Sequence, residues 1–286
     1  MKQRSKWCLI GIPDHQAVIH VGGRIGSARG PQAFRRSLSR LRHIQASLVL
    51  DQDVAGLGTD VAVNHRLVAD QVREAHQRLA PLTVVVGGGH DHGYSHLLGL
   101  KEALLATNPQ GRLGCINIDA HLDVRKPAPL ITSGSPFYLA LENGVVRGED
   151  FVEFGIQDQC NSPELFEYAR ARKVEVVDFR SLRHGKAAPA FERCLARLSS
   201  RCDAVVISLD LDAASSAFAP GVSAPQSEGF TPTDLFEMME IAGADPKVPS
   251  LGIFELNPEH DIDHRTALLG ATAAYQFIAR ATGLKI

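Results

Sequence analysis

The sequence predicts an α/β protein, a three-layer α/β/α fold with a mainly parallel and roughly eight-stranded sheet. Two observations predict this class. Short runs rich in β-branched residues alternate along the chain with longer segments whose apolar residues recur at helical spacing. Runs such as TVVV at 83–86 and AVVIS at 204–208 are almost continuously apolar, as strands buried on both faces require. Strands that alternate with helices in this way pair in parallel, with helices covering both faces.

Eight segments are expected to form strands. In chain order they are Trp7–Ile10, Ser47–Leu50, Thr83–Val86, Gly114–Ile118, Phe151–Gly155, Val174–Val177, Ala204–Leu209 and Leu251–Phe254. The clearest helical patterns between them are Phe191–Leu198 and Asp234–Ile241. Three stretches rich in Pro and Gly are short, and we interpret them as loops of one domain spanning residues 1–286. These loops are Gly22–Pro31, Lys126–Pro136 and Ala217–Gly229.

Composition and charge narrow the classes of function. The 286 residues include 30 basic and 32 acidic side chains, so no basic excess favours binding to nucleic acid or a membrane surface. No stretch approaches the ~18 consecutive apolar residues of a transmembrane helix, and the N-terminus lacks the pattern of a signal peptide. The five cysteines form no CxxC pair, which favours a reduced, cytoplasmic protein over a disulfide framework.

The first polar cluster follows the expected strand Gly114–Ile118. Asp119, His121 and Asp123 are spaced by two, so in an extended segment their side chains share one face. Carboxylate and imidazole groups together suit divalent metals such as Mn, Fe or Zn. Taken alone, the same spacing also fits a surface loop or a helix cap, and this motif leaves that alternative open.

A second carboxylate pair ends the apolar run AVVIS, where Asp210 and Asp212 are again two residues apart. Two close carboxylates repel each other unless a positive charge lies between them, and a metal ion supplies that charge. The alternative is an aspartate pair that caps a following helix. That alternative is weakened because residues 213–229 are typical of an irregular loop.

Three consecutive glycines, Gly87–Gly89, follow the run TVVV and precede His90. Glycine lets the backbone turn tightly and approach a ligand closely. A phosphate-binding loop is also glycine-rich, but the Lys-Ser/Thr ending of that motif is absent. We therefore interpret His90 as a metal ligand, against the alternative of a hydrogen-bonded loop histidine. Asp91 is a candidate to orient a ligating imidazole, whereas His92 and His96 fit ordinary packing better than a second metal pair.

Glu255 ends the last expected strand, although a salt-bridged surface glutamate explains a lone carboxylate there at least as well. The combination of motifs is more specific than its parts. The six candidate metal ligands are His90, Asp119, His121, Asp123, Asp210 and Asp212. Four aspartates balance the charge of two divalent ions, and mostly oxygen ligands favour Mn(II) over Zn(II). Two ions ~3.5–4 Å apart can activate a water molecule at neutral pH, so the sequence predicts a binuclear hydrolase.

Longer motifs extend over nearly the whole chain, from Gly11-Ile12-Pro13-Asp14 and Gly23–Pro31 to Thr266-Ala267. Together with the clusters at 87–90 and 119–125, they resemble the ureohydrolase superfamily, which includes arginase, agmatinase and formimidoylglutamase. The resemblance implies an arginase-like three-layer α/β/α fold and two Mn(II) ions per chain, held by the six candidate ligands. It also implies that Glu255 binds the cationic amidine or guanidine group of the substrate.

Within the superfamily, the sequence is most similar to the formimidoylglutamase branch. The shared stretches are Gly87–His90, Asp119–Arg125, Ser133–Phe137, Gly155–Gln157 with Asn161, Ala219–Pro225, and Glu255–Pro258 with Asp261. Arginases and agmatinases usually have a His-Gly-x-Pro stretch whose His helps in proton transfer. Here the matching stretch is Ser133–Pro136, which lacks that His. One departure is the stretch His90–His96, which is richer in His than the branch pattern, where Glu follows the ligand His.

The resemblance implies cleavage of the formimidoyl C–N bond of N-formimidoyl-L-glutamate to glutamate and formamide, a reaction of histidine degradation. Asp123 would pass a proton to the leaving amine while Glu255 holds the positive end of the substrate. Because this substrate carries two carboxylates, we expect Arg125 to bind them, with hydrogen bonds from Gln157 and Asn161. For Arg125, a surface or salt-bridging role is the alternative.

Three other functions stay open from the sequence. A related ureohydrolase would act on a guanidino compound such as agmatine or guanidinobutyrate. A non-catalytic metal-binding protein is disfavoured by the intact ligand set, and a Rossmann-type nucleotide binder by the lack of GxGxxG after the first strand. The expected partner is a small amidine or guanidino molecule, not nucleic acid or a membrane. The oligomeric state is left open between a monomer and a homo-oligomer.

Overall fold

The computed structural model describes residues 6–41 and 47–284. Within these residues, eight strands form one sheet, as predicted, and each predicted strand segment contributes one of them. The strands are β1 (Trp7–Gly11), β2 (Leu48–Asp53), β3 (Thr83–Val86), β4 (Leu113–Ile118), β5 (Phe151–Ile156), β6 (Glu175–Asp178), β7 (Ala204–Asp210) and β8 (Ser250–Phe254).

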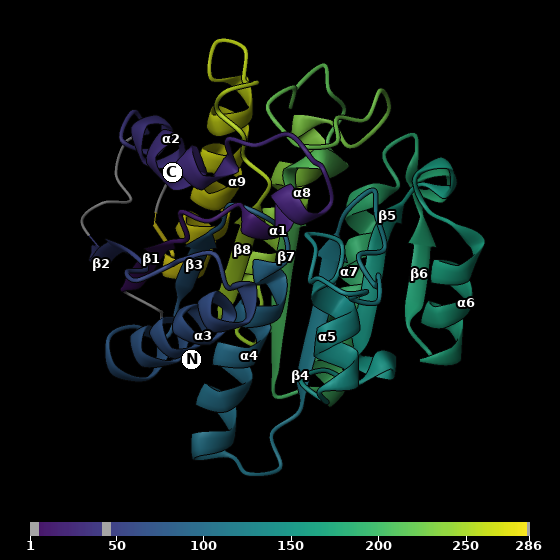
Figure 1. Cartoon of the computed structure of the whole chain (residues 1–286). Coiled ribbons are helices and arrows are strands. Elements are labelled where there is room, and N and C mark those ends of the chain that lie inside the picture. The colour runs from purple at the N-terminus through teal and green to yellow at the C-terminus, as the bar shows by residue number, and fades with distance from the viewer. Residues whose placement is uncertain (1–5, 42–46, 285–286) are drawn as a thin grey trace.

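The strand order is β2-β1-β3-β8-β7-β4-β5-β6, and every pairing is parallel. The carboxyl ends of all strands therefore lie at one edge of the sheet (Figure 1). The four adjacent central strands β3, β8, β7 and β4 lead directly into the segments that carry the candidate ligands. Strand order alone thus brings segments up to about 165 residues apart in the chain to one place.

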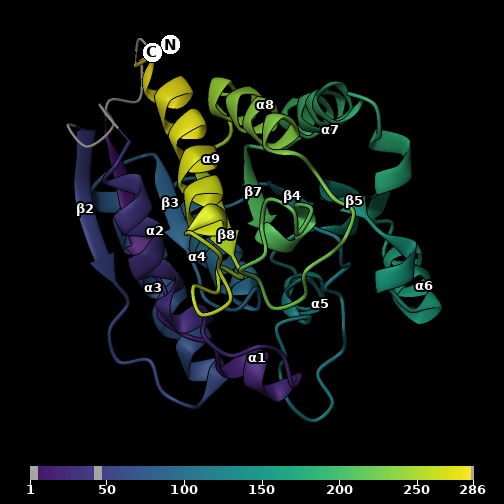
Figure 2. The same cartoon turned by 90° about the horizontal axis from the view of Figure 1, so that it is seen from above.

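Helices cover both faces of the sheet (Figures 1 and 2). One core cluster joins the sheet to α2 (Gly30–Leu38), α7 (Ala187–Arg201), α8 (Pro232–Ala244) and α9 (Arg265–Thr282). The second core cluster joins the opposite face to α3 (Val61–Arg78), α4 (His92–Thr107), α5 (Pro136–Glu142) and α6 (Pro163–Ala171). These clusters are the two interfaces of the predicted three-layer fold. Among the described helices, none combines the length and apolar character needed to cross a membrane.

Burial follows the position of each strand in the sheet. The central strands β3, β4 and β8 are buried at every residue, as their continuous apolar runs predict. The edge strand β2 buries its side chains only partly and in alternation, and it continues to Asp53, beyond the predicted end at Leu50. Its outward Asp51 and Asp53 both accept hydrogen bonds from Arg35 of α2. The apolar run predicts only the first part of β2, because its last three residues, Asp51, Gln52 and Asp53, are all polar.

The predicted loops were only partly right. The stretch Gly22–Pro31 contains a 3₁₀ turn, Ser27–Arg29, and the first two residues of α2, where Pro31 fits because the first helical turn needs no N–H donors. The stretch Lys126–Pro136 likewise ends in the first residue of α5. The short helix α1 (Gln16–His20) was not predicted. Ala217–Gly229 forms no helix or strand beyond an isolated bridge at Gln226, as expected.

Candidate metal centre

The glycine loop after β3 brings His90 to the carboxyl edge of the sheet. A Cβ atom on Gly88 would lie 1.6 Å from the carbonyl oxygen of Asp14, so only glycine fits where these two segments cross. The loop is also joined to the end of β8. Glu255 N donates to Gly88 O at 2.8 Å, and His90 N donates to Glu255 Oε1 at 2.9 Å. One backbone–backbone and one backbone–side-chain hydrogen bond therefore hold His90 and Glu255 side by side.

The His90 ring faces three carboxylates. Its Nδ1 lies 3.0–3.1 Å from one carboxylate oxygen of each of Asp119, Asp123 and Asp210. On its other side, Nε2 lies 2.9 Å from Ser208 Oγ. Because Ser208 holds one ring nitrogen, the other is directed into the carboxylate group, which is the arrangement expected of a metal-ligating histidine.

Asp119, His121 and Asp123 follow β4 in a turn, not in the extended segment expected from their spacing. Asp119 Oδ1 accepts a hydrogen bond from His121 N at 2.7 Å, and Asp123 has a positive φ of 47°. This turn directs all three side chains inward, and His121 Nδ1 lies 3.4 Å from Asp119 Oδ1. The structure thus brings the three residues together through a local turn rather than through strand alternation.

Asp210 and Asp212 lie at the end of β7. Asp210 Oδ1 caps the 3₁₀ turn Leu211–Ala213 by accepting a hydrogen bond from Asp212 N at 2.8 Å, so the capping alternative holds for this one oxygen. The second oxygen of Asp210 faces His90, and Asp212 Oδ2 lies 3.2 Å from His121 Nδ1. Capping by one oxygen fixes the direction of the other.

The six predicted ligands form two overlapping groups. In each group, one ligand atom from every residue lies within 4.8 Å of the others. The first group consists of His90, Asp119, Asp123 and Asp210, and the second consists of Asp119, His121 and Asp212. Asp119 belongs to both, as expected of a carboxylate that serves two neighbouring ions. The arrangement is consistent with a binuclear metal site.

Unpaired polar atoms surround the same space. Among the described residues, His90 Nδ1, Asp212 Oδ1 and Glu255 Oε2 are buried and make no hydrogen bond. A buried polar atom without a partner costs about 1–3 kcal/mol of stability. Imidazole and carboxylate groups that converge without hydrogen bonds are the donor set that divalent ions bind, so the residues present fit two such ions.

The raised pKa values of the carboxylates in the site also indicate that it is suited to hold positive charge. Burial and the neighbouring charges of Asp212 and Asp119 raise the pKa of Asp210 well above its usual value. Burial, opposed by His121 and reinforced by Asp119, raises the pKa of Asp212 to about 7. Burial and Asp210 likewise raise the pKa of Glu255. Carboxylates so placed become stable anions at neutral pH when positive charge lies among them, which two divalent ions would supply.

Arg125, predicted to bind substrate, lies exposed at the rim of this centre. Its backbone N donates to Gly134 O at 2.8 Å. A Cβ atom on Gly134 would lie 3.2 Å from the Arg125 guanidinium and 3.4 Å from Asp123 Oδ1, so the guanidinium and this carboxylate flank the same glycine. Arg125 makes no ion pair with any side chain in the described ranges. A bidentate cation therefore lies next to the candidate ligands.

Gln157 and Asn161 lie deeper than Arg125, and their side chains form hydrogen bonds with the protein backbone. Gln157 Nε2 donates to Glu228 O at 2.9 Å. The Asn161 amide donates to Ala120 O, and its oxygen accepts from Leu122 N at 2.8 Å. Asn161 thus supports the backbone of the turn that carries Asp119, His121 and Asp123. Substrate binding by these two residues stays a prediction.

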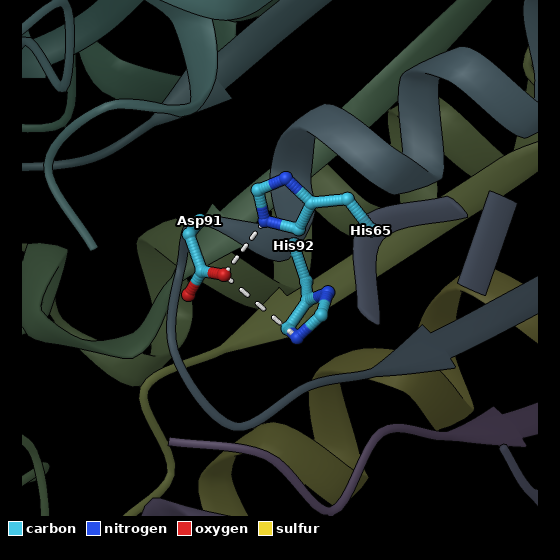
Figure 3. A group of neighbouring side chains, drawn as sticks. All are labelled: His65, Asp91 and His92. Carbon is cyan, nitrogen blue, oxygen red and sulfur yellow. Dashed lines mark hydrogen bonds and ion pairs between the residues drawn. The ribbon is translucent and has the colours of Figure 1, made fainter. Parts of the chain in front are cut away.

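A second buried group consists of His65, Asp91 and His92 (Figure 3). His65 Nε2 lies 2.8 Å from Asp91 Oδ2, and His92 Nε2 lies 3.8 Å from the same oxygen. The expectation that Asp91 orients a ligating imidazole was wrong for His90, because Ser208 takes that position and Asp91 contacts His65 instead. No motif in the sequence pointed to His65, which comes from the distant helix α3.

The group of His65, Asp91 and His92 could hold an ion by geometry alone. However, His92 Nε2 also lies 3.0 Å from Asp14 Oδ2, and His92 Nδ1 lies 3.0 Å from Ser95 Oγ. None of the unpaired buried atoms in the described chain belongs to these three residues. We therefore interpret the group as a hydrogen-bonded support for the glycine loop, in contrast to the six-residue centre.

His96 lies apart from both groups. Its Nε2 lies 2.7 Å from Ser250 Oγ of β8, and burial, reinforced by His76, lowers its pKa to about 3. Neither group of candidate ligands in the described residues contains His96. The contacts of His96 thus agree with the expectation that it packs in the core and does not pair with His92 around a metal.

We expect His96 to make the fold sensitive to acid. Its pKa is about 3 in the folded protein, against the usual 6.5, so between these values the unfolded chain binds a proton that the folded chain does not. The contribution of His96 to stability is complete above pH 6.5 and falls by about 1.4 kcal/mol per pH unit below it. Chemical denaturation of His96→Gln between about pH 4 and 6 should show a flatter pH dependence of the unfolding free energy.

The control for this experiment is His260→Gln, which removes an exposed histidine. The wild-type protein and this control should lose stability in parallel as the pH falls. A His96→Gln variant with the wild-type slope would contradict the expectation.

Three further polar residues lie beneath the centre, and sequence reasoning gave none of them a role. Ser208 of β7, Asn117 of β4 and Glu153 of β5 occupy neighbouring register positions in the sheet. All three are buried. Their only signal in the sequence is that each interrupts an otherwise apolar strand, which could have marked them as supports of the ligands that follow.

The parallel sheet with two overlapping His/Asp groups at its carboxyl edge puts the chain in a class of α/β proteins whose side chains are consistent with a binuclear metal site. Within that class, the pattern of the arginase family matches residues 5–279. The chain therefore belongs to the arginase family, the ureohydrolases. It shares with that family the eight-stranded parallel sheet flanked by helices.

Several named proteins are similar over nearly the whole length. A formimidoylglutamase of Staphylococcus carnosus is 34% identical over 276 residues, which cover 94% of this chain and 85% of that protein. A formimidoylglutamase of Rhodococcus jostii is 33% identical, and the match covers 95% of this chain and 85% of that protein. The structure of a Trypanosoma cruzi formiminoglutamase with Mn2+2 is similar with a TM-score of 0.86 and 28% identity, covering 99% and 95% of the two chains.

Proposed function

We propose that this ureohydrolase is a manganese-dependent formimidoylglutamase that hydrolyses N-formimidoyl-L-glutamate to L-glutamate and formamide. The observation that carries the choice of substrate is the rim beside Asp123. There the stretch Ser133–Pro136 lacks the histidine usual in arginases and agmatinases, and Arg125 presents a cation. The similarity to formimidoylglutamases over nearly the whole chain supports the same substrate. A cationic rim favours a substrate with carboxylates and disfavours the amine tail of agmatine.

The six ligands would hold two Mn(II) ions, which supply an activated water molecule when bound. Glu255 accepts a hydrogen bond from His90 N through Oε1, which leaves the buried Oε2 to accept from the cationic formimidoyl nitrogen. Asp123 is 12% exposed and lies towards the rim. Asp123 would take a proton from the water that adds to the formimidoyl carbon and give it to the glutamate nitrogen as the C–N bond breaks.

Replacing Arg125 by methionine should raise KM for formimidoylglutamate by about 10-fold or more with little change in kcat, since a hydrogen-bonded charge pair contributes about 1.5–3 kcal/mol. The KM of Arg125→Lys should lie between those of wild type and Arg125→Met, because lysine keeps the charge but loses the bidentate geometry. Steady-state kinetics of both variants check this. Lys126→Met, which removes the adjacent exposed cation, is the matched control. Equal KM values for Arg125→Met and wild type would remove Arg125 from the substrate site.

Product analysis tests the proposed function. The manganese-loaded protein would be incubated separately with formimidoylglutamate, arginine, agmatine and guanidinobutyrate, with Asp210→Asn as the inactive control. Release of formamide and glutamate, and turnover of the first compound alone, is the expected result. Turnover of a guanidino compound instead would keep the metal chemistry and overturn the substrate. No turnover by protein that binds two ions would favour a non-catalytic member of the family.

A further inference from the structure

A row of polar side chains crosses the middle of the sheet directly beneath the metal centre. Glu153 of β5 pairs in register with Asn117 of β4, and Asn117 pairs with Ser208 of β7. Glu153 and Asn117 are fully buried. Ser208 lies under Asp210 because side chains two residues apart on a strand share a face, and Asn117 lies under Asp119, to whose carboxylate its Nδ2 donates. A carboxylate in the interior of a parallel sheet is costly unless it is paired or protonated.

Two side-chain oxygen atoms in this row accept no hydrogen bond from the described residues. Asn117 Nδ2 donates to Glu153 Oε2 at 2.9 Å and to Asp119 Oδ2 at 3.2 Å. Both N–H groups of the amide are therefore used. Glu153 Oε1 and Asn117 Oδ1 are both buried and have no hydrogen-bond partner among the described residues. Each is an acceptor that lacks a donor, and they belong to the two side chains that are already paired.

One proton would satisfy both acceptors. A carboxylic acid and a primary amide form a cyclic pair in which the acid O–H donates to the amide oxygen while the amide N–H donates to the acid carbonyl. The second of these bonds is present between Asn117 Nδ2 and Glu153 Oε2. A proton on Glu153 Oε1 would supply the first, leaving the other amide N–H directed at Asp119 Oδ2.

We propose that Glu153 is a positioning residue, a neutral carboxylic acid that pairs with Asn117 and keeps its amide N–H directed at Asp119. If the amide were turned over, Asn117 would present its oxygen to the Asp119 carboxylate and repel it. Asp119 is common to both groups of candidate ligands, so its orientation affects both ions. The proposal rests on the metal centre of the proposed function and is independent of the substrate.

The surroundings of Glu153 favour the neutral acid. Burial and the charges of Asp119 and Asp123 raise the pKa of Glu153 well above its usual value, while Asn117 and His90 oppose that shift. Burial raises the pKa of the Cys115 thiol, on the same strand as Asn117, well above its usual value, so this thiol stays uncharged.

Manganese titration of two variants tests the proposal. Glu153→Gln keeps the cyclic pair, because its amide N–H can donate to Asn117 Oδ1 while its oxygen accepts from Asn117 Nδ2. This variant should bind two Mn(II) ions with affinities within about 3-fold of wild type, since partners that orient ligands typically change affinity by 10–100-fold only when they are lost. Glu153→Met has a similar length but no hydrogen bonds, and it should weaken binding by about 10–100-fold. Glu175→Met on β6 controls for loss of a glutamate from the sheet.

Each outcome of the manganese titration either supports or overturns the proposal. Wild-type affinity in a folded Glu153→Met variant would overturn the proposal, and so would equal losses in both variants, because the charge of Glu153 would then matter instead of the pair. Infrared difference spectra of wild type against Glu153→Gln cover the case in which the methionine variant does not fold. A protonated carboxyl band in the manganese-loaded wild type at neutral pH is expected, and a carboxylate signal in its place would overturn the assignment. Neither readout depends on the substrate, so a failed assay with formimidoylglutamate leaves this test intact.

Discussion

Replacing Asp210 by asparagine is expected to lower formimidoylglutamate turnover by more than about 100-fold, beyond the effect typical of residues that only orient a ligand. The substitution keeps an oxygen that can accept from Asp212 N, so the turn that follows β7 is preserved. It removes the charge of the oxygen that faces His90 at 3.0 Å. Steady-state kinetics and manganese content of the purified variant check the result, and loss of metal should accompany loss of turnover.

The same variant should be more stable than wild type when both are free of metal. The folded-state pKa of Asp210 is raised, so the folded protein binds its proton more tightly than the unfolded chain does. An acid of this kind destabilises the fold as the pH rises above its unfolded value of 3.8, and a neutral asparagine removes that penalty. Denaturation of metal-free protein at about pH 8 measures this.

Asp178→Asn is the matched control, because Asp178 also caps a 3₁₀ turn, Phe179–Leu182, but lies outside both candidate groups. It should keep both activity and metal. An Asp210→Asn variant that retains wild-type activity would show that this carboxylate is not a ligand, whatever its geometry.

Glu255→Gln is expected to lower kcat/KM by about 100-fold while two ions stay bound. The glutamine oxygen can still accept from His90 N, so the glycine loop keeps its place. The buried Oε2, which has no partner in the described chain, would be replaced by an uncharged N–H group facing the cationic formimidoyl nitrogen. A hydrogen bond between charged partners contributes about 1.5–3 kcal/mol, and this one is buried.

Manganese stoichiometry separates the two roles open to Glu255. A variant that binds two ions but turns over slowly supports a substrate-facing carboxylate. A variant that loses an ion would instead make Glu255 a metal ligand, and a variant with wild-type kinetics would give it neither role.

Much of this arrangement could be predicted from the sequence because it depends on local patterns. Continuous apolar runs marked the central strands, and polar residues directly after them marked the carboxyl edge, where parallel strands place ligand sites. Three separate motifs therefore predicted the candidate ligands from the sequence alone. The edge strand β2 was predicted too short because its last three residues, Asp51, Gln52 and Asp53, are all polar, as a partly exposed edge strand allows.

The supporting residues could not be predicted because their partners are distant in the chain. Ser208 meets His90 from 118 positions away, and His65 meets Asp91 from another helix. A lone serine, asparagine or glutamate inside an apolar run gives no hint of its partner, which only strand order and register decide. The turn at Asp119–Asp123 was hidden for a different reason, since a positive φ at Asp123 leaves no pattern in the residue types.

The most direct test of the two-ion centre is anomalous diffraction at the manganese absorption edge from crystals grown with Mn(II). We expect two peaks ~3.5–4 Å apart, a separation typical of binuclear hydrolases. One should lie among His90, Asp119, Asp123 and Asp210, and the other among Asp119, His121 and Asp212. A single peak, no peak, or a peak between His65, Asp91 and His92 would contradict the two-ion centre proposed for this ureohydrolase.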